Sequence, residues 1–183
     1  MFSIKSTLFV VLCGLSQVHA QDFNPKYANE FLNMGVGAAA LGMGSAVVAD
    51  VDGLHAGVWN PAGLLHQNRE TEIGLMHASY FGGLAAFDHM GISRRIHAQT
   101  VLGLNAIRFG VDNIYNTTQL IDNQGNIDYS QLQSFNSADY ALIGSVGKPT
   151  RVQNLNIGLS AKVIYRHIGN FAKAFGFGFD VGL

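Results

Sequence analysis

The fold is decided by two stretches near the C-terminal end, LNIGLSAKVIY (Leu155–Tyr165) and AFGFGFDVGL (Ala174–Leu183). In both, large apolar residues alternate with small or polar ones, and only Ile164 breaks the pattern. Alternate side chains of an extended strand point to opposite faces of a sheet. Each stretch therefore predicts a β-strand with one apolar face and one small, polar face.

The length of these strands separates two all-β architectures that share the alternation. A soluble β-sandwich turns the apolar face inward and uses strands of about 5–6 residues. A strand that crosses a membrane needs about 9–11 tilted residues. Both stretches have the membrane length, so the sequence favours a transmembrane antiparallel β-barrel, and the soluble sandwich stays as an alternative.

Four further strands are predicted upstream, with a regular arrangement of connections. Their approximate bounds are Glu72–Ser79, Leu84–Ser93, Thr100–Val111 and Ala138–Val146. Turns at residues 94–99 and 148–154 fall at one end of the strands. A tight turn near residues 81–83, a long polar loop at 112–136 and a turn at 167–173 fall at the other. Short turns at one end and longer loops at the other are typical of outer-membrane barrels.

The number of predicted strands bears on the completeness of the barrel. Six strands are too few, because the smallest membrane barrels have about eight. We therefore expect residues 71–183 to be the first part of the barrel of a longer protein. A barrel built from several chains and a soluble protein are the alternatives.

The first twenty residues have the pattern of a secretory signal peptide. Lys5 precedes an apolar run at Leu8–Leu15, and the segment ends in a small residue, Ala20. The sole cysteine, Cys13, lies within this segment, so the mature chain is expected to have neither a disulfide nor a lipid anchor. Without Lys5 the chain is slightly acidic, which gives no reason to expect a nucleic-acid partner.

A glycine-rich stretch, NMGVGAAALGMGSA (Asn33–Ala46), permits two interpretations. A dinucleotide-binding loop requires a preceding strand and an acidic residue about twenty positions later. The sequence offers neither, since Asp50 and Asp52 come too early. We therefore expect small residues that let backbone segments pack closely.

A short helix is predicted after this stretch. Asn60 is placed to cap a helix that begins at Pro61, whose fixed φ suits the first helical position. Trp59 and Leu64 would anchor this turn against a wall. Residues 21–70 then form a compact plug, or hatch, inside the barrel.

The segment FLNMGVGAAALGMGSAVVADVDGLHAGVWNPAGL (Phe31–Leu64) resembles the opening of the PorV/PorQ family, which belongs with the FadL-like outer-membrane barrels. The final AFGFGFDVGL resembles a strand of that family. Ala39 and Ser45 depart from it, because the family often has an arginine and a glycine there. The residues that carry the hatch motif are Gly42, Gly44, Trp59, Asn60, Pro61, Ala62 and Gly63.

The resemblance implies a barrel of about fourteen strands with an N-terminal hatch, located in the bacterial outer membrane in contact with its lipid. It also implies a role in type IX protein secretion, with secretion-system and cargo proteins as partners. FadL-like relatives instead admit hydrophobic small molecules, so a passive channel is the second hypothesis. A soluble secreted β-sandwich that binds a partner is the third.

Three charged residues lie on the small faces of the last two strands. Lys162, Arg166 and Asp180 point into the barrel lumen if the apolar faces meet lipid. Asp180 is expected to pair with a basic residue of the preceding strand. The alternative is that these charges orient a ligand.

No metal, cofactor or catalytic site is expected. The histidines are scattered and lack the spacing of a zinc site, and the sequence has neither an HExxH motif nor the GxSxG motif of a serine hydrolase. The histidines considered are His55, His66, His77, His89, His97 and His167. We therefore predict a transport or secretion component and not an enzyme.

Overall fold

The computed structural model of the protein describes residues 29–121 and 125–183. The predicted signal peptide, residues 1–20, and the first part of the predicted hatch, residues 21–28, lie outside the described residues. The features below belong to the compact unit Phe31–Leu183 and to Glu30, which begins its first helical turn.

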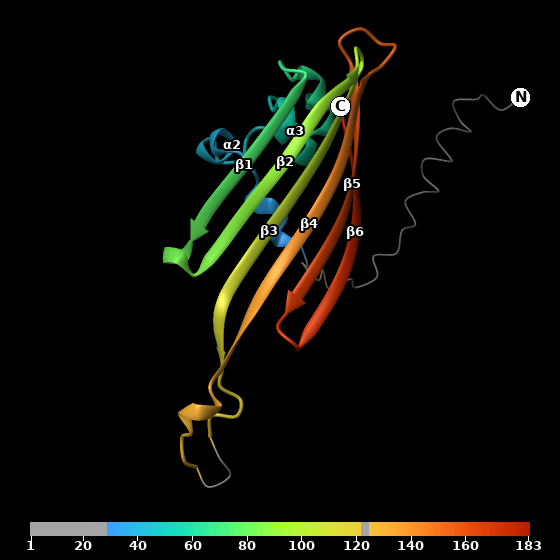
Figure 1. Ribbon diagram of the computed structural model, residues 1–183. Helices are drawn as coiled ribbons and strands as arrows, with labels where there is room; N and C mark the ends of the chain where they lie inside the picture. The colour runs from blue at the N-terminus through green and yellow to red at the C-terminus, as the bar shows by residue number, and fades with distance from the viewer. Residues whose placement is uncertain (1–28, 122–124) are drawn as a thin grey trace, which may run out of the picture. The chain divides into compact units, whose positions relative to one another are not determined.

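The structure is dominated by one antiparallel sheet in which each strand pairs with the next along the chain (Figure 1). The strands are β1 Thr71–Tyr80, β2 Ala85–His97, β3 Thr100–Asn116, β4 Gln133–Pro149, β5 Asn156–Ile168 and β6 Ala172–Gly182. The all-β prediction is thereby confirmed. The sheet is not closed into a barrel, because β1 and β6 do not pair with each other.

All six predicted strands are present. The predicted loop at 112–136 is shorter in the structure, because β3 extends to Asn116 and β4 begins at Gln133. β3 and β4 continue to pair from Ile114–Phe135 to Asn116–Gln133. The register shifts between Val111 and Ile114, where Asn113 has a φ of 59°. Such a bulge ends the alternation without ending the backbone pairing, so a polar sequence that predicted a loop forms an extended hairpin.

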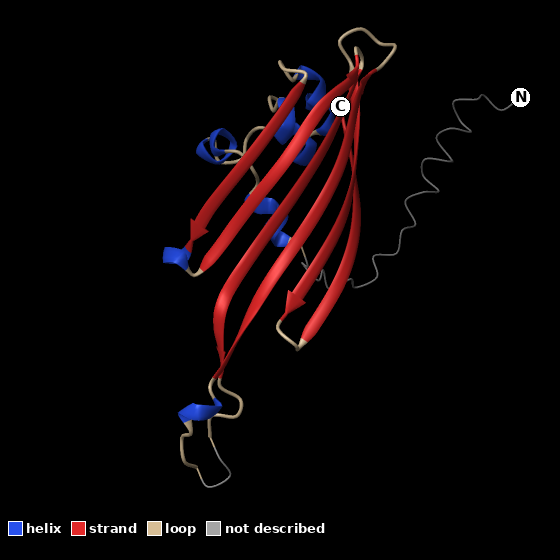
Figure 2. Cartoon of the chain, viewed as in Figure 1, coloured by secondary structure: helices blue, strands red, loops and turns tan. Residues whose placement is uncertain are grey.

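The short helical turns before β1 lie on one face of the sheet, whereas those between strands lie in the connections beyond the strand ends (Figure 2). Before β1 they are η1 Glu30–Met34, α2 Ala38–Gly42, α3 Gly53–Trp59 and η2 Pro61–His66, and between strands they are η3 Phe81–Gly83 and η4 Tyr129–Gln131. We call residues 30–70 the covering segment. Within the described parts of the chain, no helix is long and apolar enough to cross a membrane.

The core lies between the covering segment and the sheet. One cluster joins Phe31 and Val36 of the covering segment to residues of β2–β5. A second joins Ala56 and Leu64 to Val101 on β3. Because these side chains are almost fully buried, the covering segment is an integral part of the fold.

Candidate functional site: the covered face of the sheet

The two faces of the sheet differ in a way that is unusual for a water-soluble protein. The face under the covering segment, here the covered face, buries polar side chains. These are His89, Ser93, Asn105, Ser145 and Ser160. The same face also buries apolar side chains, among them Phe87, Ile107 and Ile143, so it is mixed in character. Soluble proteins usually cover their most apolar surface, and here the mixed face is the one that is covered.

The opposite face, here the open face, is apolar and uncovered by the described residues. Its exposed fraction reaches 79% at Leu75 and 82% at Phe179. The exposed large apolar side chains of this face include Ile73, Leu75, Met90, Ile92, Leu102, Leu104, Leu142, Ile157, Leu159, Val163, Phe175, Phe177, Phe179 and Val181. A contiguous apolar face of this size indicates contact with a partner or a membrane.

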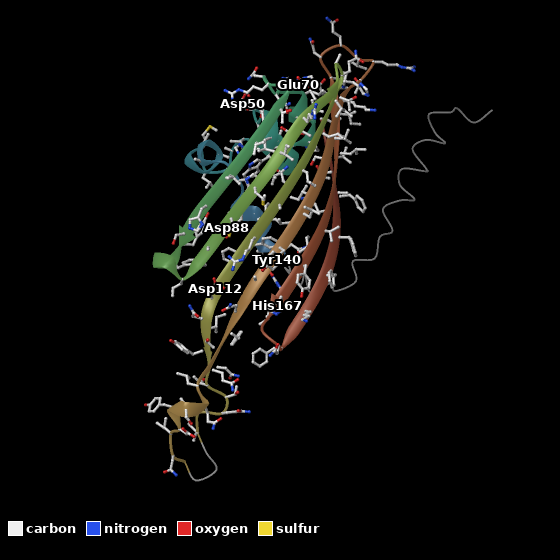
Figure 3. The ribbon with its side chains drawn as sticks, viewed as in Figure 1. Asp50, Glu70, Asp88, Asp112, Tyr140 and His167 are labelled. Carbon is white, nitrogen blue, oxygen red and sulfur yellow. The ribbon has the colours of Figure 1, made fainter. Side chains whose placement is uncertain are left out.

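One row of polar and aromatic side chains crosses the open face near the place where β1 ends and β2 begins. On β1–β3, His77 Nδ1 lies 2.6 Å from Asp88 Oδ1, and Arg108 Nη1 donates to Asp88 Oδ2 at 3.2 Å. On β4 and β5 the row continues with Tyr140 and Tyr165, whose ring centroids are 6.2 Å apart. Figure 3 shows Asp88 and Tyr140 along this row, with Glu70 toward the opposite end of the strands.

Glycines on the covered face allow the covering segment to lie directly on the backbone of the sheet. A Cβ at Gly158 on β5 would collide with backbone atoms of Pro61 and Ala62. A Cβ at Gly182 on β6 would collide with the side chain of Asn60. The small face predicted for the last two strands is therefore the surface against which η2 packs.

Hydrogen bonds join the covering segment to the first strand of the sheet, β1, and to β4 and β5 on the other side of the same face. Ser145 Oγ and Ser160 Oγ donate to the Gly57 carbonyl at 2.8 and 3.2 Å. The backbone N–H of Leu54 donates to Glu72 Oε2 on β1 at 3.0 Å. The contacts span β1 to β5, so they hold this segment across most of the sheet.

A second set of hydrogen bonds fixes the chain where it enters β1. Arg95 Nη2 donates to the carbonyls of Leu65 and Gln67, each at 3.0 Å. Ser93 Oγ donates to Gln67 Oε1 at 2.7 Å. Arg95 and Gln67 had not been singled out from the sequence, because their contacts depend on the placement of the covering segment.

The predicted roles of Asn60 and Pro61 are confirmed. Asn60 Oδ1 accepts from the N–H of Ala62 at 3.2 Å, and Pro61 is the first residue of η2. Asn60 Nδ2 also donates to the carbonyls of Val48 and Leu183, each at 3.0 Å. Asn60 therefore caps the helix and joins it to both the covering segment and the end of the sheet.

The predicted anchors beside this cap also have partners. Trp59 Nε1 donates to the Val36 carbonyl at 2.9 Å, and Leu64 is fully buried against Val101. A Cβ at Gly63 would collide with the Val51 carbonyl. These contacts place the motif residues 59–63 where the covering segment folds back on itself.

The predicted crowding at the glycine-rich stretch is correct at its start and wrong at its end. A Cβ at Gly35 would collide with the indole ring of Trp59. At Gly42 and Gly44, in contrast, no atom of the described residues comes within 4 Å of a Cβ position. Gly44 has a φ of 63°, so glycine is needed there for the backbone conformation and not for space. The number of glycines in a sequence does not distinguish these two reasons for a glycine.

The charged residues predicted for the lumen lie on the covered face as ion pairs. Lys162 Nζ lies 2.7 Å from Asp180 Oδ2, which confirms the expected pairing between neighbouring strands. Arg166 pairs instead with Asp139 on β4, through bonds of 2.5 and 2.6 Å. Asp139 had not been singled out, although it stands directly opposite Arg166 in the register.

A buried polar pair lies beneath α3. His89 Nε2 lies 2.8 Å from Asn105 Oδ1, and the His55 ring lies 5.8 Å from that of His89. His89 Nδ1 and Asn105 Nδ2 make no hydrogen bond within the described part of the chain. Burial lowers the pKa of His55 below its ordinary value, so the packing here favours the neutral imidazole.

One cavity of about 580 Å³ lies between the covering segment and the last two strands. Apolar side chains, among them Val58 and Trp59, line one part of it, and the Lys162–Asp180 pair lines another. Among residues 29–121 and 125–183, no group of three side chains is arranged to hold a metal ion. No protein-family model, no curated protein and no solved structure matches this chain.

Proposed function

We propose that the sheet is part of the wall of a transmembrane β-barrel in the bacterial outer membrane, with the covering segment as the hatch in its lumen. The observation that carries the proposal is that the mixed face of the sheet is covered while its more apolar face is uncovered by the described residues. A soluble sandwich covers its apolar face. A membrane barrel turns that face to lipid and keeps its polar face inside.

The dimensions of the open face support this placement. On β4 the apolar part of the face is bounded by Tyr140 at one end and Lys148 at the other. At about 3.3 Å per residue and a tilt of about 40°, this segment spans about 20 Å along the membrane normal. That height is close to the apolar band of about 25 Å in outer-membrane barrels.

Both borders of this band have the expected chemistry. The row of Asp88, Arg108, Tyr140 and Tyr165 crosses one border. Aromatic girdles and charges occur at the interfaces of such barrels and not at their midplane. Arg94 lies at the other border, so the charges of the open face stand where headgroups would be.

The longest connection favours one orientation. The long connection 117–132 joins β3 to β4 at the same end as the aromatic row, whereas the turns at 98–99 and 150–155 lie at the other end. Outer-membrane barrels have short periplasmic turns and longer extracellular loops. The end of the sheet near Arg94 is therefore assigned to the periplasm.

Closure of the wall needs more than six strands. The smallest membrane barrels have about eight, and unpaired backbone groups at a sheet edge are costly in lipid. The resemblance to PorV/PorQ proteins implies about fourteen strands. We assign the additional strands to a longer form of this protein, and the intact mass of the protein from an outer-membrane fraction tests this against 19.7 kDa for the present chain.

As its biological role we assign support of type IX secretion, in which the barrel binds secretion-system and cargo proteins at the outer membrane. The resemblance of Phe31–Leu64 motivates this role. A hatch joined to the wall from β1 to β6 also suits a binding platform better than an open pore. Deletion of the gene should abolish cargo secretion, and secretion at the parental rate would contradict the assignment.

A passive channel for hydrophobic small molecules is the second function. The cavity beside Trp59, which combines apolar side chains with the Lys162–Asp180 pair, favours it. Loss of uptake of fatty or aromatic compounds on deletion, with intact secretion, would identify this role. Recovery of the protein in the soluble fraction without detergent would contradict both roles and favour the soluble sandwich.

A further inference from the structure

A groove of about 680 Å³ crosses the apolar open face of the sheet. Its floor is formed by Gly144 on β4 and Ala161 on β5. Leu104 borders it on one side and Phe179 on the other, and Arg94 stands at its periplasmic end. The groove therefore combines an apolar channel with a single cationic side chain.

The register of the strands explains the hollow. Leu104, Gly144, Ala161 and Phe179 form one continuous row across β3–β6. The two smallest side chains of this row are neighbours, and large ones stand on either side. Apart from its two chain neighbours, no atom of the described residues lies within 4 Å of the position of a Cβ at Gly144, so the floor is open there.

An apolar groove on a lipid-facing surface is best filled by an acyl chain. Between apolar protein and lipid there is little hydrophobic driving force, and packing decides association. A chain that lies in the hollow gains dispersion contacts on several sides, whereas a chain on a flat part of the wall gains them on one. The groove therefore favours an ordered acyl chain over one that exchanges freely with the surrounding lipid.

Arg94 supplies the second element of recognition. Its side chain is 64% exposed, and its Nη2 atom lies 3.7 Å from Glu70 Oε1 in a solvent-exposed pair. Pairs of this kind contribute little, so the guanidinium remains available to a stronger partner. Guanidinium groups bind phosphate through paired hydrogen bonds. Lys148, on β4, adds positive charge at the same end of the sheet as Arg94.

From this geometry we infer that the groove binds one phospholipid of the periplasmic leaflet, with an acyl chain over Gly144 and Ala161 and its phosphate on Arg94. The inference rests on the proposed placement of the sheet in the membrane. It adds a lipid site on the outside of the wall, separate from the cavity at the hatch.

The test is electron paramagnetic resonance of spin-labelled phosphatidylglycerol in phosphatidylcholine vesicles that contain the protein as purified from an outer-membrane fraction. We expect the spectrum to contain a component from immobile lipid. Gly144→Leu and Ala161→Leu should each remove this component, because each fills the groove. Arg94→Gln should weaken the preference for phosphatidylglycerol about fivefold, because one basic residue near an anionic lipid surface contributes about 1 kcal/mol.

Two variants of the same face serve as matched controls. Ala106→Leu adds the same bulk to the open face outside the groove, and Lys173→Gln removes a positive charge at the opposite end of the sheet. Both should retain the immobile component and the lipid preference.

The possible outcomes separate this inference from the proposed function. A chain that floats free of the vesicles overturns both. If the chain inserts but shows no immobile component, or keeps it in both leucine variants, the lipid site alone is wrong. Displacement of the labelled phospholipid by lipopolysaccharide would also overturn the assignment.

Discussion

Gly158 lies directly beneath Pro61 and Ala62, so replacing it with alanine should loosen the covering segment. The new Cβ would stand 2.6 Å from the Pro61 carbonyl oxygen and closer still to the Pro61 carbonyl carbon and the Ala62 nitrogen. All three are backbone atoms, so no flexible side chain can move aside. Either β5 or the covering segment must shift.

The size of the effect follows from the cost of overpacking. An extra methyl group in a well-packed interior costs typically 1–3 kcal/mol. The covering segment relieves this cost if it separates from β5. The fraction of molecules in which it has separated, here the lifted population, then rises about 5- to 150-fold. Gly178→Ala is a matched control on the same face, because its Cβ would lie 3.8 Å from the nearest atoms, which belong to the Lys162 side chain.

Alkylation of a single cysteine measures the lifted population. The only cysteine of the sequence, Cys13, lies in the predicted signal peptide. In a Cys13→Ser background, Val101→Cys therefore gives a single thiol, at a fully buried position beneath Leu64. The rate of labelling should rise in the Gly158→Ala background and stay at the parental value in the Gly178→Ala background.

Equal labelling rates in the two backgrounds would refute the packing of η2 against the backbone of β5. A rise in both would indicate that alanine disturbs the strands themselves. Only the difference between the two glycines, which share a face and differ in what lies above them, supports the reasoning.

Three further outcomes are expected. Ser160→Ala should lower the free energy of unfolding by about 1 kcal/mol more in a Ser145→Ala background than alone, because the two hydroxyls lie 2.8 Å from each other and both within hydrogen-bond distance of the Gly57 carbonyl, which loses its last side-chain donor only in the double variant; additive urea midpoints would argue against this shared network. Arg166→Gln should cost about 1–3 kcal/mol, because the carboxylate of Asp139, 13% exposed, loses both hydrogen bonds, and an unchanged midpoint would contradict this. The lowered pKa of His55 means that the unfolded chain binds the proton more tightly, so stability should fall as the pH drops below about 6.5. A His55→Gln variant should lose part of that decrease, and identical pH profiles would contradict the assignment.

The strands could be predicted because their signal is local. Alternation in Ala174–Leu183 is set by neighbouring residues, and the pleat converts it directly into two faces. The cap at Asn60 and Pro61 is equally local, since its partner is two residues away. The polar hairpin beyond Val111 could not be predicted in this way, because pairing between backbones needs no apolar pattern.

Contacts between distant segments were recovered only in part. The Lys162–Asp180 pair followed from the adjacency of the last two strands. The partner of Arg166 required the register of β4 against β5, which the sequence does not state. The bonds from Ser145 and Ser160 to Gly57 join residues 88 and 103 positions apart, and no periodicity indicates them.

The sequence by itself determined that this chain forms strands with one apolar and one small face, because strand alternation needs no information beyond neighbouring residues. Only the tertiary structure decided which face is covered. The backbone of the covering segment fits closely where glycines such as Gly158 and Gly182 leave room and where Ser145, Ser160 and Arg95 satisfy its carbonyls. Most of the apolar face offers neither, because its large apolar side chains hold a backbone at a distance and provide no hydrogen-bond donors.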